Sequence, residues 1–236
     1  MNAFISRESL PANPAWDQGD HYRPHPSKPI SLSEMNRHAG AILFQLATTM
    51  RESLDLNTML QTAVNEIRAI FQCDRCYVLW HCRRDAEDED SSFPILAVTH
   101  EIQHTTLPKL SEACPLNQTI VLADKILKRQ TLRINDLDTD HLEKPLAVLL
   151  DCWDIKSCLL IPFITRSGQQ GALVCANTYP HAWDDAEVDL LGAIVSHLEI
   201  AIEQANLYAQ AQASERAAQA QARQLQTALE HLKQTQ

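Results

Sequence analysis

The chain has 236 residues, 45% of them hydrophobic and 21% charged, a composition typical of a globular protein. Its formal net charge of -10 disfavours nucleic-acid binding, because a phosphate backbone would repel it. No apolar run reaches the roughly 18 residues of a membrane span, and the N-terminus lacks the pattern of a secretory signal. We therefore expect a cytoplasmic protein that binds neither nucleic acid nor membranes. The odd number of cysteines, seven, predicts free thiols.

The N-terminal part divides into an arm and a helix. Residues 1–30 contain five of the eleven prolines among polar residues, which predicts a disordered arm. Ser31 and Glu34 have the spacing of a capping box, and apolar residues then recur every three or four positions. This pattern predicts a first helix that ends near Leu54.

The spacing of apolar residues over 57–99 changes from a helical period to the period of two that is typical of strands. Asp55 or Asn57 can cap a second amphipathic helix, which the apolar stripe carries to Phe71. Residues 75–81 and 93–99 are rich in aromatic and β-branched residues, which predicts two strands joined by a polar loop.

The middle of the chain alternates between helices and strands. Apolar spacing predicts helices over 116–127 and 142–150, with a short strand over 131–134 between them. Residues 157–163 and 170–176 are two apolar runs separated by a turn that contains Gly168. They predict a β-hairpin.

The last 53 residues, from Asp184 to Gln236, contain no proline and one glycine, and Asp184 with Glu187 repeats the capping-box spacing. One helix of this length would reach about 80 Å, so part of it must leave the body. Its apolar residues continue with coiled-coil spacing after Tyr208, which predicts a homodimer through the N- and C-terminal helices. The residues expected in this dimer and signal helix are Leu198, Ile202, Tyr208, Leu225, Leu229 and Leu232.

One segment matches an enzymatic motif. His100, Glu101 and His104 form HExxH, which on a helix binds zinc and activates water, and this leaves zinc hydrolysis as one hypothesis. The segment follows strand-like residues, however, and a strand would separate the two histidines by about 13 Å. The interpretation we favour is therefore a solvated strand.

The cysteines allow a redox or metal role, but packing explains them as well. Cys73 and Cys76 have redox or metal spacing, yet no second CxxC pair completes a zinc ribbon. An iron–sulfur or redox role stays open, with buried packing as the default interpretation. Without a phosphate-binding loop or nucleophile motif, we expect that the chain is not an enzyme.

Three stretches of the sequence resemble GAF domains of cyanobacterial signalling proteins. They are LDLNTMLQTAVNEIRAIFQCDRCYVLW, SCLLIPFITRSGQQGALVCA and WDDAEVDLLGAIVSHLEIAIEQANLYAQA. The resemblance implies a protein of mixed α/β structure, of the α+β type. In such a fold an antiparallel sheet is flanked by helices, and here a long C-terminal coiled-coil helix follows. It divides the chain into an arm (1–30), a GAF domain with its N-terminal helix (31–208) and a coiled-coil signalling linker (209–236).

The resemblance also implies a function. ARQLQTALEHLKQTQ is similar to the linker ahead of the phosphoacceptor helix of sensor histidine kinases, which implies a sensor whose kinase domain lies outside this chain. Related photoreceptors attach a bilin through a Cys-His pair, but the matching place here holds Pro145 and Leu146, which argues against covalent bilin binding. The cofactor is unknown. Noncovalent binding of a ligand stays open, with three candidate pocket residues, Trp153, Cys158 and Cys152.

Overall fold

The computed structural model describes residues 40, 48, 55–82, 95–110 and 120–234. The predicted arm over 1–30 and the polar loop after Cys82 lie outside the described residues. So does the first helix, apart from Gly40 and Thr48, both of which are helical.

Five strands form one antiparallel sheet in the order β2-β1-β5-β4-β3. The central hairpin of β4 and β5 is the predicted one, and Gly168 in its turn has the positive φ of 85° that favours glycine. The second strand is longer than its apolar alternation predicts, because it continues beyond Thr99. The strands are β1 (Arg75–Cys82), β2 (Ile95–Gln103), β3 (Leu132–Ile134), β4 (Ser157–Ile164) and β5 (Gln170–Asn177).

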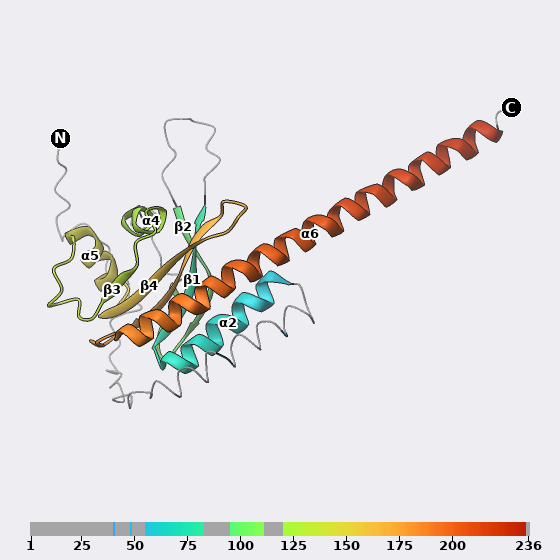
Figure 1. The fold of residues 1–236 in the computed structure, drawn as a ribbon. Helices are drawn as coiled ribbons and strands as arrows, with labels where there is room; N and C mark the ends of the chain where they lie inside the picture. The colour runs from blue at the N-terminus through green and yellow to red at the C-terminus, as the bar shows by residue number, and fades with distance from the viewer. Residues whose placement is uncertain (1–39, 41–47, 49–54, 83–94, 111–119, 235–236) are drawn as a thin grey trace, which may run out of the picture.

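Four longer helices accompany the sheet in the described part of the chain, each in a place that the apolar spacing predicts (Figure 1). Of the two caps that the sequence offers the first of them, Asp55 is the one used, since its carboxylate accepts hydrogen bonds from the backbone N–H groups of Asn57 and Thr58. The helices are α2 (Leu56–Phe71), α4 (Ile120–Leu127), α5 (Lys144–Cys152) and α6 (Asp185–Gln234).

The helices cover both faces of the sheet and divide the core into two layers. Because side chains alternate along a strand, β1 contributes Cys76 and Val78 to the layer under α2 and α6. Tyr77 and Leu79 belong to the other layer, under α4 and α5. We refer to these as the α2/α6 layer and the α4/α5 layer. The arrangement confirms the predicted α+β fold class.

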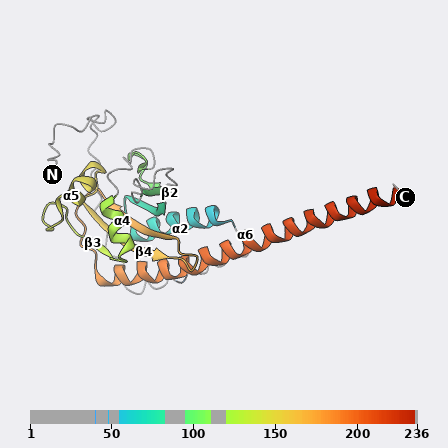
Figure 2. The ribbon, with the colours of Figure 1, turned by 90° about the horizontal axis from the view of Figure 1, so that it is seen from above.

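The long helix α6 belongs to the body only over its first part. Its side chains are buried at intervals as far as Ala205, and from Leu207 to Thr227 nearly all described side chains are at least partly exposed. At 1.5 Å per residue its 50 residues span about 75 Å, and Figure 2 shows the C-terminal part leaving the body. In the described residues, no helix is long and apolar enough to cross a membrane.

Gly171 lies where the sheet leaves no room for a Cβ atom, and this supports a stability prediction. A Cβ atom there would lie 2.5 Å from the Leu79 carbonyl oxygen and 2.6 Å from the Phe163 ring. Gly171→Ala should therefore lower the free energy of unfolding by about 1–3 kcal/mol, measured by urea denaturation. Gly192→Ala is the control, because in α6 its Cβ meets nothing closer than Ile161 at 3.9 Å. The free energy of unfolding of Gly192→Ala should rise by about 0.5–1 kcal/mol. If it fell as much as that of Gly171→Ala, the packing argument would be contradicted.

Candidate functional site

The start of α6 is held by a reciprocal pair of hydrogen bonds. The backbone N–H of Glu187 donates to the Asp184 carboxylate, and the backbone N–H of Asp184 donates to the Glu187 carboxylate, each at 2.8 Å. This is the capping box that the spacing predicts, and it satisfies N–H groups that have no partner inside the helix. The first turn of α6 is therefore anchored to the residues before it.

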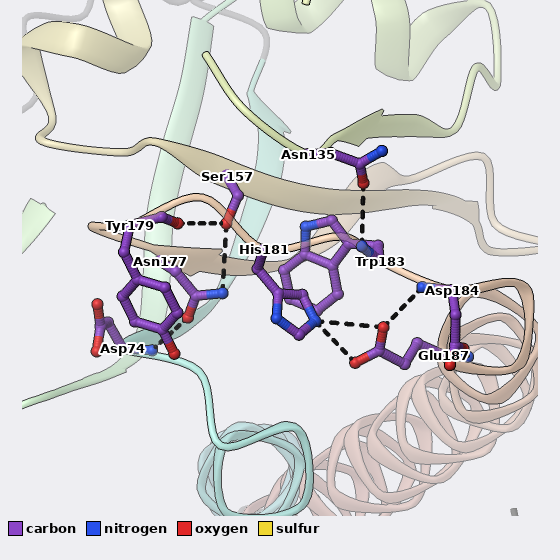
Figure 3. Close-up of polar contacts among 9 residues, drawn as sticks. All are labelled: Asp74, Asn135, Ser157, Asn177, Tyr179, His181, Trp183, Asp184 and Glu187. Atoms are coloured by element: carbon purple, nitrogen blue, oxygen red, sulfur yellow. Dashed lines mark hydrogen bonds and ion pairs between the residues drawn. The ribbon is translucent and has the colours of Figure 1, made fainter. Parts of the chain in front are cut away.

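Those preceding residues are bound to the end of β3 (Figure 3). Asn135 accepts two backbone hydrogen bonds, from His181 to its carbonyl at 2.9 Å and from Trp183 to its side-chain oxygen at 3.0 Å. The His181 ring lies 3.0 Å from the Glu187 carboxylate and stands edge-on to the Trp183 ring. Sequence reasoning missed Asn135 and His181, because no short-range pattern marks a contact between residues 48 positions apart.

A buried polar cluster ties the end of β5 to two other strands (Figure 3). The side-chain oxygen of Asn177 accepts from the backbone N–H of Asp74 at 3.0 Å, and the Ser157 hydroxyl donates to the Tyr179 carbonyl at 2.9 Å. The Asp74 carboxylate accepts from both the backbone N–H and the hydroxyl of Thr178. The segment between β5 and α6 is thus bonded to the first residues of β4 and to the residue before β1.

A second set of contacts lies where α6 leaves the sheet. Glu199 accepts a hydrogen bond from the backbone N–H of Ile164 at 2.9 Å, and Glu203 accepts one from Ser167 at 3.3 Å. Both donors belong to the end of β4 and the hairpin turn that follows. The helix is therefore attached to the sheet at its start and again about four turns later.

The Glu101 carboxylate has a structural partner. It lies 3.7 Å from the Arg75 guanidinium, both side chains are almost fully buried, and it accepts a hydrogen bond from the backbone N–H of Leu110 at 2.8 Å. Arg75 also donates to the Pro108 carbonyl, and burial lowers the pKa of its guanidinium. A carboxylate held in this way stabilises the segment after β2 instead of presenting a base to water.

The HExxH segment is a strand and not a helix. His100 lies within β2 and His104 just after its end, so the two rings lack the one-turn spacing that places both on one ion. Each ring is hydrogen-bonded to a threonine, Thr99 for His100 and Thr106 for His104, both at 2.9 Å. Burial lowers the pKa of His100. Among the residues that the structure describes, no group of three His, Cys, Asp or Glu side chains could hold a metal ion.

The candidate pocket residues and the CxxC pair fall on opposite sides of the sheet. Trp153 and Cys158 are buried in the α4/α5 layer, where burial raises the pKa of the Cys158 thiol to about 12. Cys152 is exposed at the end of α5. Cys73 and Cys76 are buried in the α2/α6 layer. The structure therefore brings Trp153 and Cys158 into one layer and separates them from the CxxC pair.

The residues expected in the signal helix also separate into two groups. Leu198 and Ile202 are buried against their own sheet, so their side chains do not face a second copy. Tyr208 and Leu225 are exposed, at 45% and 67%. Leu229 and Leu232 lie in the helix, but their side chains are outside the described residues.

Comparison with known proteins identifies the family. The family model described as "GAF domain" matches residues 55–202, which is more than half of the chain. The chain belongs to the GAF domain family. The match begins at the cap of α2 and ends within α6, so it contains the sheet and the contacts that Asn135 makes with the residues before α6 and that Glu199 of α6 makes with the end of β4.

The chain is also similar to cyanobacterial histidine kinases. It is 26% identical over 200 residues to the circadian input-output histidine kinase CikA of Thermosynechococcus vestitus, covering 78% of this chain and 26% of that protein. It is 26% identical over 208 residues to CikA of Synechocystis sp. strain PCC 6803, covering 81% and 27%. The chain spans about a quarter of the length of these relatives.

Solved structures of similar fold include GAF domains of cyanobacterial proteins. The phycoerythrobilin-bound GAF domain of a cyanobacterial phytochrome matches with a TM-score of 0.59 and 19% identity, covering 73% of this chain and 98% of that one. The third GAF domain of Slr1393 from Synechocystis sp. PCC 6803, in its photoproduct state, matches with a TM-score of 0.56 and 23% identity, covering 67% and 99%. At these identities the likeness shows the fold.

The cap of α6 supports a prediction about the stability of its first turn. Asp184→Ala removes the acceptor for the Glu187 N–H and should cost about 1 kcal/mol of unfolding free energy, measured by urea denaturation. Asp184→Asn keeps an acceptor oxygen and should stay close to wild type. Amide hydrogen exchange should accelerate in the first turn of α6 in the alanine variant. Equal losses in the two variants would show that the hydrogen bond is not what holds this turn.

Proposed function

We propose that this GAF domain is the sensory input module of a two-component signalling protein, and that it relays its signal through a dimeric C-terminal helix to a downstream histidine kinase. The observation that carries the proposal is the continuity of α6, one helix from its cap at Asp184 to Gln234. Its first part belongs to the folded body and its last part is exposed. A displacement at one end of a continuous helix moves the other end.

The two attachments of α6 supply a physical route for this relay. Asn135 connects the helix start to the end of β3, and Glu199 connects the helix to the end of β4. A change in the sheet or in the α4/α5 layer therefore acts on α6 at two positions along its length. Two such positions favour rotation or tilting of the whole helix over local fraying. The similarity to CikA kinases supports a kinase as the output.

The proposal places catalysis in another domain. We infer that this chain is not itself an enzyme and that the kinase activity belongs to an output domain outside it. We further propose that the protein is a cytoplasmic homodimer. The exposed Tyr208 and Leu225 support a second copy of the same helix as the partner, since large apolar side chains on an exposed helix are covered in paired coils.

Two lysine variants in the exposed C-terminal part of α6 test the dimer. Leu225→Lys places a charge in the predicted apolar seam, whereas Thr227→Lys places the same charge two residues away, outside that seam. Light scattering after size exclusion should give a dimer for the wild type and for Thr227→Lys, and mainly monomer for Leu225→Lys. Circular dichroism checks that both variants keep their helix content. A monomeric wild type, or equal effects of the two lysines, would contradict the dimeric relay.

A second candidate function is a photoreceptor or redox sensor that binds a chromophore or another cofactor without a covalent bond. Three buried donor atoms support it, because buried donors are nearly always paired. The Trp153 indole nitrogen and two guanidinium nitrogens of Arg75 have no hydrogen-bond partner within the described structure. Trp153 lies in the α4/α5 layer, and Arg75 shares the β1 face of Tyr77. A ligand with acceptor oxygens would satisfy them.

Two tryptophan variants test this second function. Cells that make phycocyanobilin and biliverdin should yield a coloured protein, measured by absorption spectroscopy after purification. Trp153→Phe removes the unpaired indole N–H in the α4/α5 layer and should reduce the visible absorbance of the bound chromophore. Trp183→Phe is the matched control, because its indole nitrogen is also buried and unpaired but lies in the α2/α6 layer. A colourless wild type, or equal losses in both variants, would count against a chromophore in the α4/α5 layer.

A further inference from the structure

Three cysteine thiols meet in the α2/α6 layer. Cys76 on β1 and Cys175 on β5 are directly opposite each other in the antiparallel register. Cys73, which precedes β1, is buried in the same layer, and its thiol donates a hydrogen bond to the Arg75 carbonyl at 3.1 Å. The pKa of the Cys175 thiol, raised by burial, is also affected by both Cys73 and Cys76. All three are buried free thiols. We refer to Cys73, Cys76 and Cys175 together as the thiol cluster.

The strand register permits a disulfide between Cys76 and Cys175. Directly opposite residues of antiparallel strands have Cα atoms about 4.5–5.5 Å apart. This separation lies inside the range of about 4.4–6.8 Å found for disulfide-bonded cysteines. The strands do not have to move apart or slide, and only the two sulfur atoms have to approach each other.

We propose that the thiol cluster is a site of reversible two-electron oxidation, in which Cys175 forms a disulfide with Cys76 or Cys73 and the oxidant is a small uncharged hydroperoxide. One thiol of the cluster attacks the peroxide O–O bond and becomes a sulfenic acid, and an alcohol or water molecule leaves. A second thiol attacks that sulfur, the S–S bond forms, and the hydroxyl group leaves as water with the thiol's proton. Two thiols are oxidised and one peroxide is reduced.

The surroundings of the cluster select this class of oxidant. Burial raises the pKa of Cys73, Cys76 and Cys175, so at neutral pH the thiols are protonated and unreactive until the layer opens. The three sulfur atoms of the cluster are buried, so none of them is offered to a bulky, charged reagent such as glutathione disulfide. Hydrogen peroxide is small and uncharged, so a brief local opening admits it.

The position of the cluster connects its oxidation to α6. The thiols share the α2/α6 layer with Ile194 and Leu198 of that helix. A disulfide shortens the separation of two sulfur atoms to about 2.05 Å, and close-packed side chains above them must then readjust. Oxidation would thus act on the same helix as the proposed relay. The chemistry itself does not depend on the proposed function, since it is measured on the sulfur atoms.

The experiment maps the disulfide in the purified full chain. The reduced protein is treated with hydrogen peroxide or with glutathione disulfide, its remaining thiols are alkylated after unfolding, and tryptic peptides are analysed by mass spectrometry. Cleavage after Arg75 separates Cys73 from Cys76, so the two possible disulfides give different cross-linked peptides. We expect a peptide pair that contains Cys175, lighter by two hydrogens than the separate peptides and lost on reduction, after peroxide but not after glutathione disulfide.

Matched variants decide whether the cluster is responsible. Cys175→Ala should abolish the cross-link, whereas Cys158→Ala should leave it unchanged, because Cys158 is a buried thiol of the opposite layer. If Cys175→Ala does not fold, the double variant Cys73→Ala with Cys76→Ala makes the same test. A Cys175 disulfide absent from the peroxide-treated wild type, or a Cys175 disulfide joining two chains, would overturn the proposal. Equal cross-linking by glutathione disulfide would overturn the assigned oxidant class.

Discussion

The structure depends on the burial of the first part of α6 against the sheet. Ile194, Leu198 and Ile202 are buried there, and the same helix then continues beyond the body without a break. Each of these side chains contributes about 1.5–3 kcal/mol on leaving water, so the body cannot release the helix without losing much of its own stability. A helix that is part of the core is coupled to whatever deforms the core.

The two faces of the sheet carry different chemistry. The α4/α5 layer contains Trp153 and faces Arg75, whose unpaired donors suit a ligand that accepts hydrogen bonds. The α2/α6 layer contains the thiol cluster and the buried part of α6. Strand alternation creates this division, because neighbouring residues of β1 and β5 point to opposite layers. This division is the basis of our proposal that the sheet receives two kinds of input and passes both to one helix.

Local patterns predicted most of the fold. The capping spacing of Asp184 and Glu187 and the glycine of the β4–β5 turn were readable because a cap or a turn involves residues within a few positions. The apolar alternation that predicts β2 ends at Thr99, whereas the strand continues to Gln103, as the strand interpretation of the HExxH segment expects. The HEIQ residues that follow Thr99 look polar, and the buried Glu101 side chain has two partners distant in sequence, the Arg75 guanidinium and the Leu110 N–H.

The sequence by itself determined the order of helices and strands and the length of α6, because periodicity, caps and turn residues are local properties of the chain. The family was indicated separately, by the three stretches that resemble GAF domains. Only the tertiary structure decided that Asn135 holds the linker before α6, that Leu198 and Ile202 face their own sheet, and that Cys175 lies opposite Cys76. These contacts connect residues dozens of positions apart. Their formation depends on strand register and on which layer each side chain enters, and neither is encoded in spacing alone.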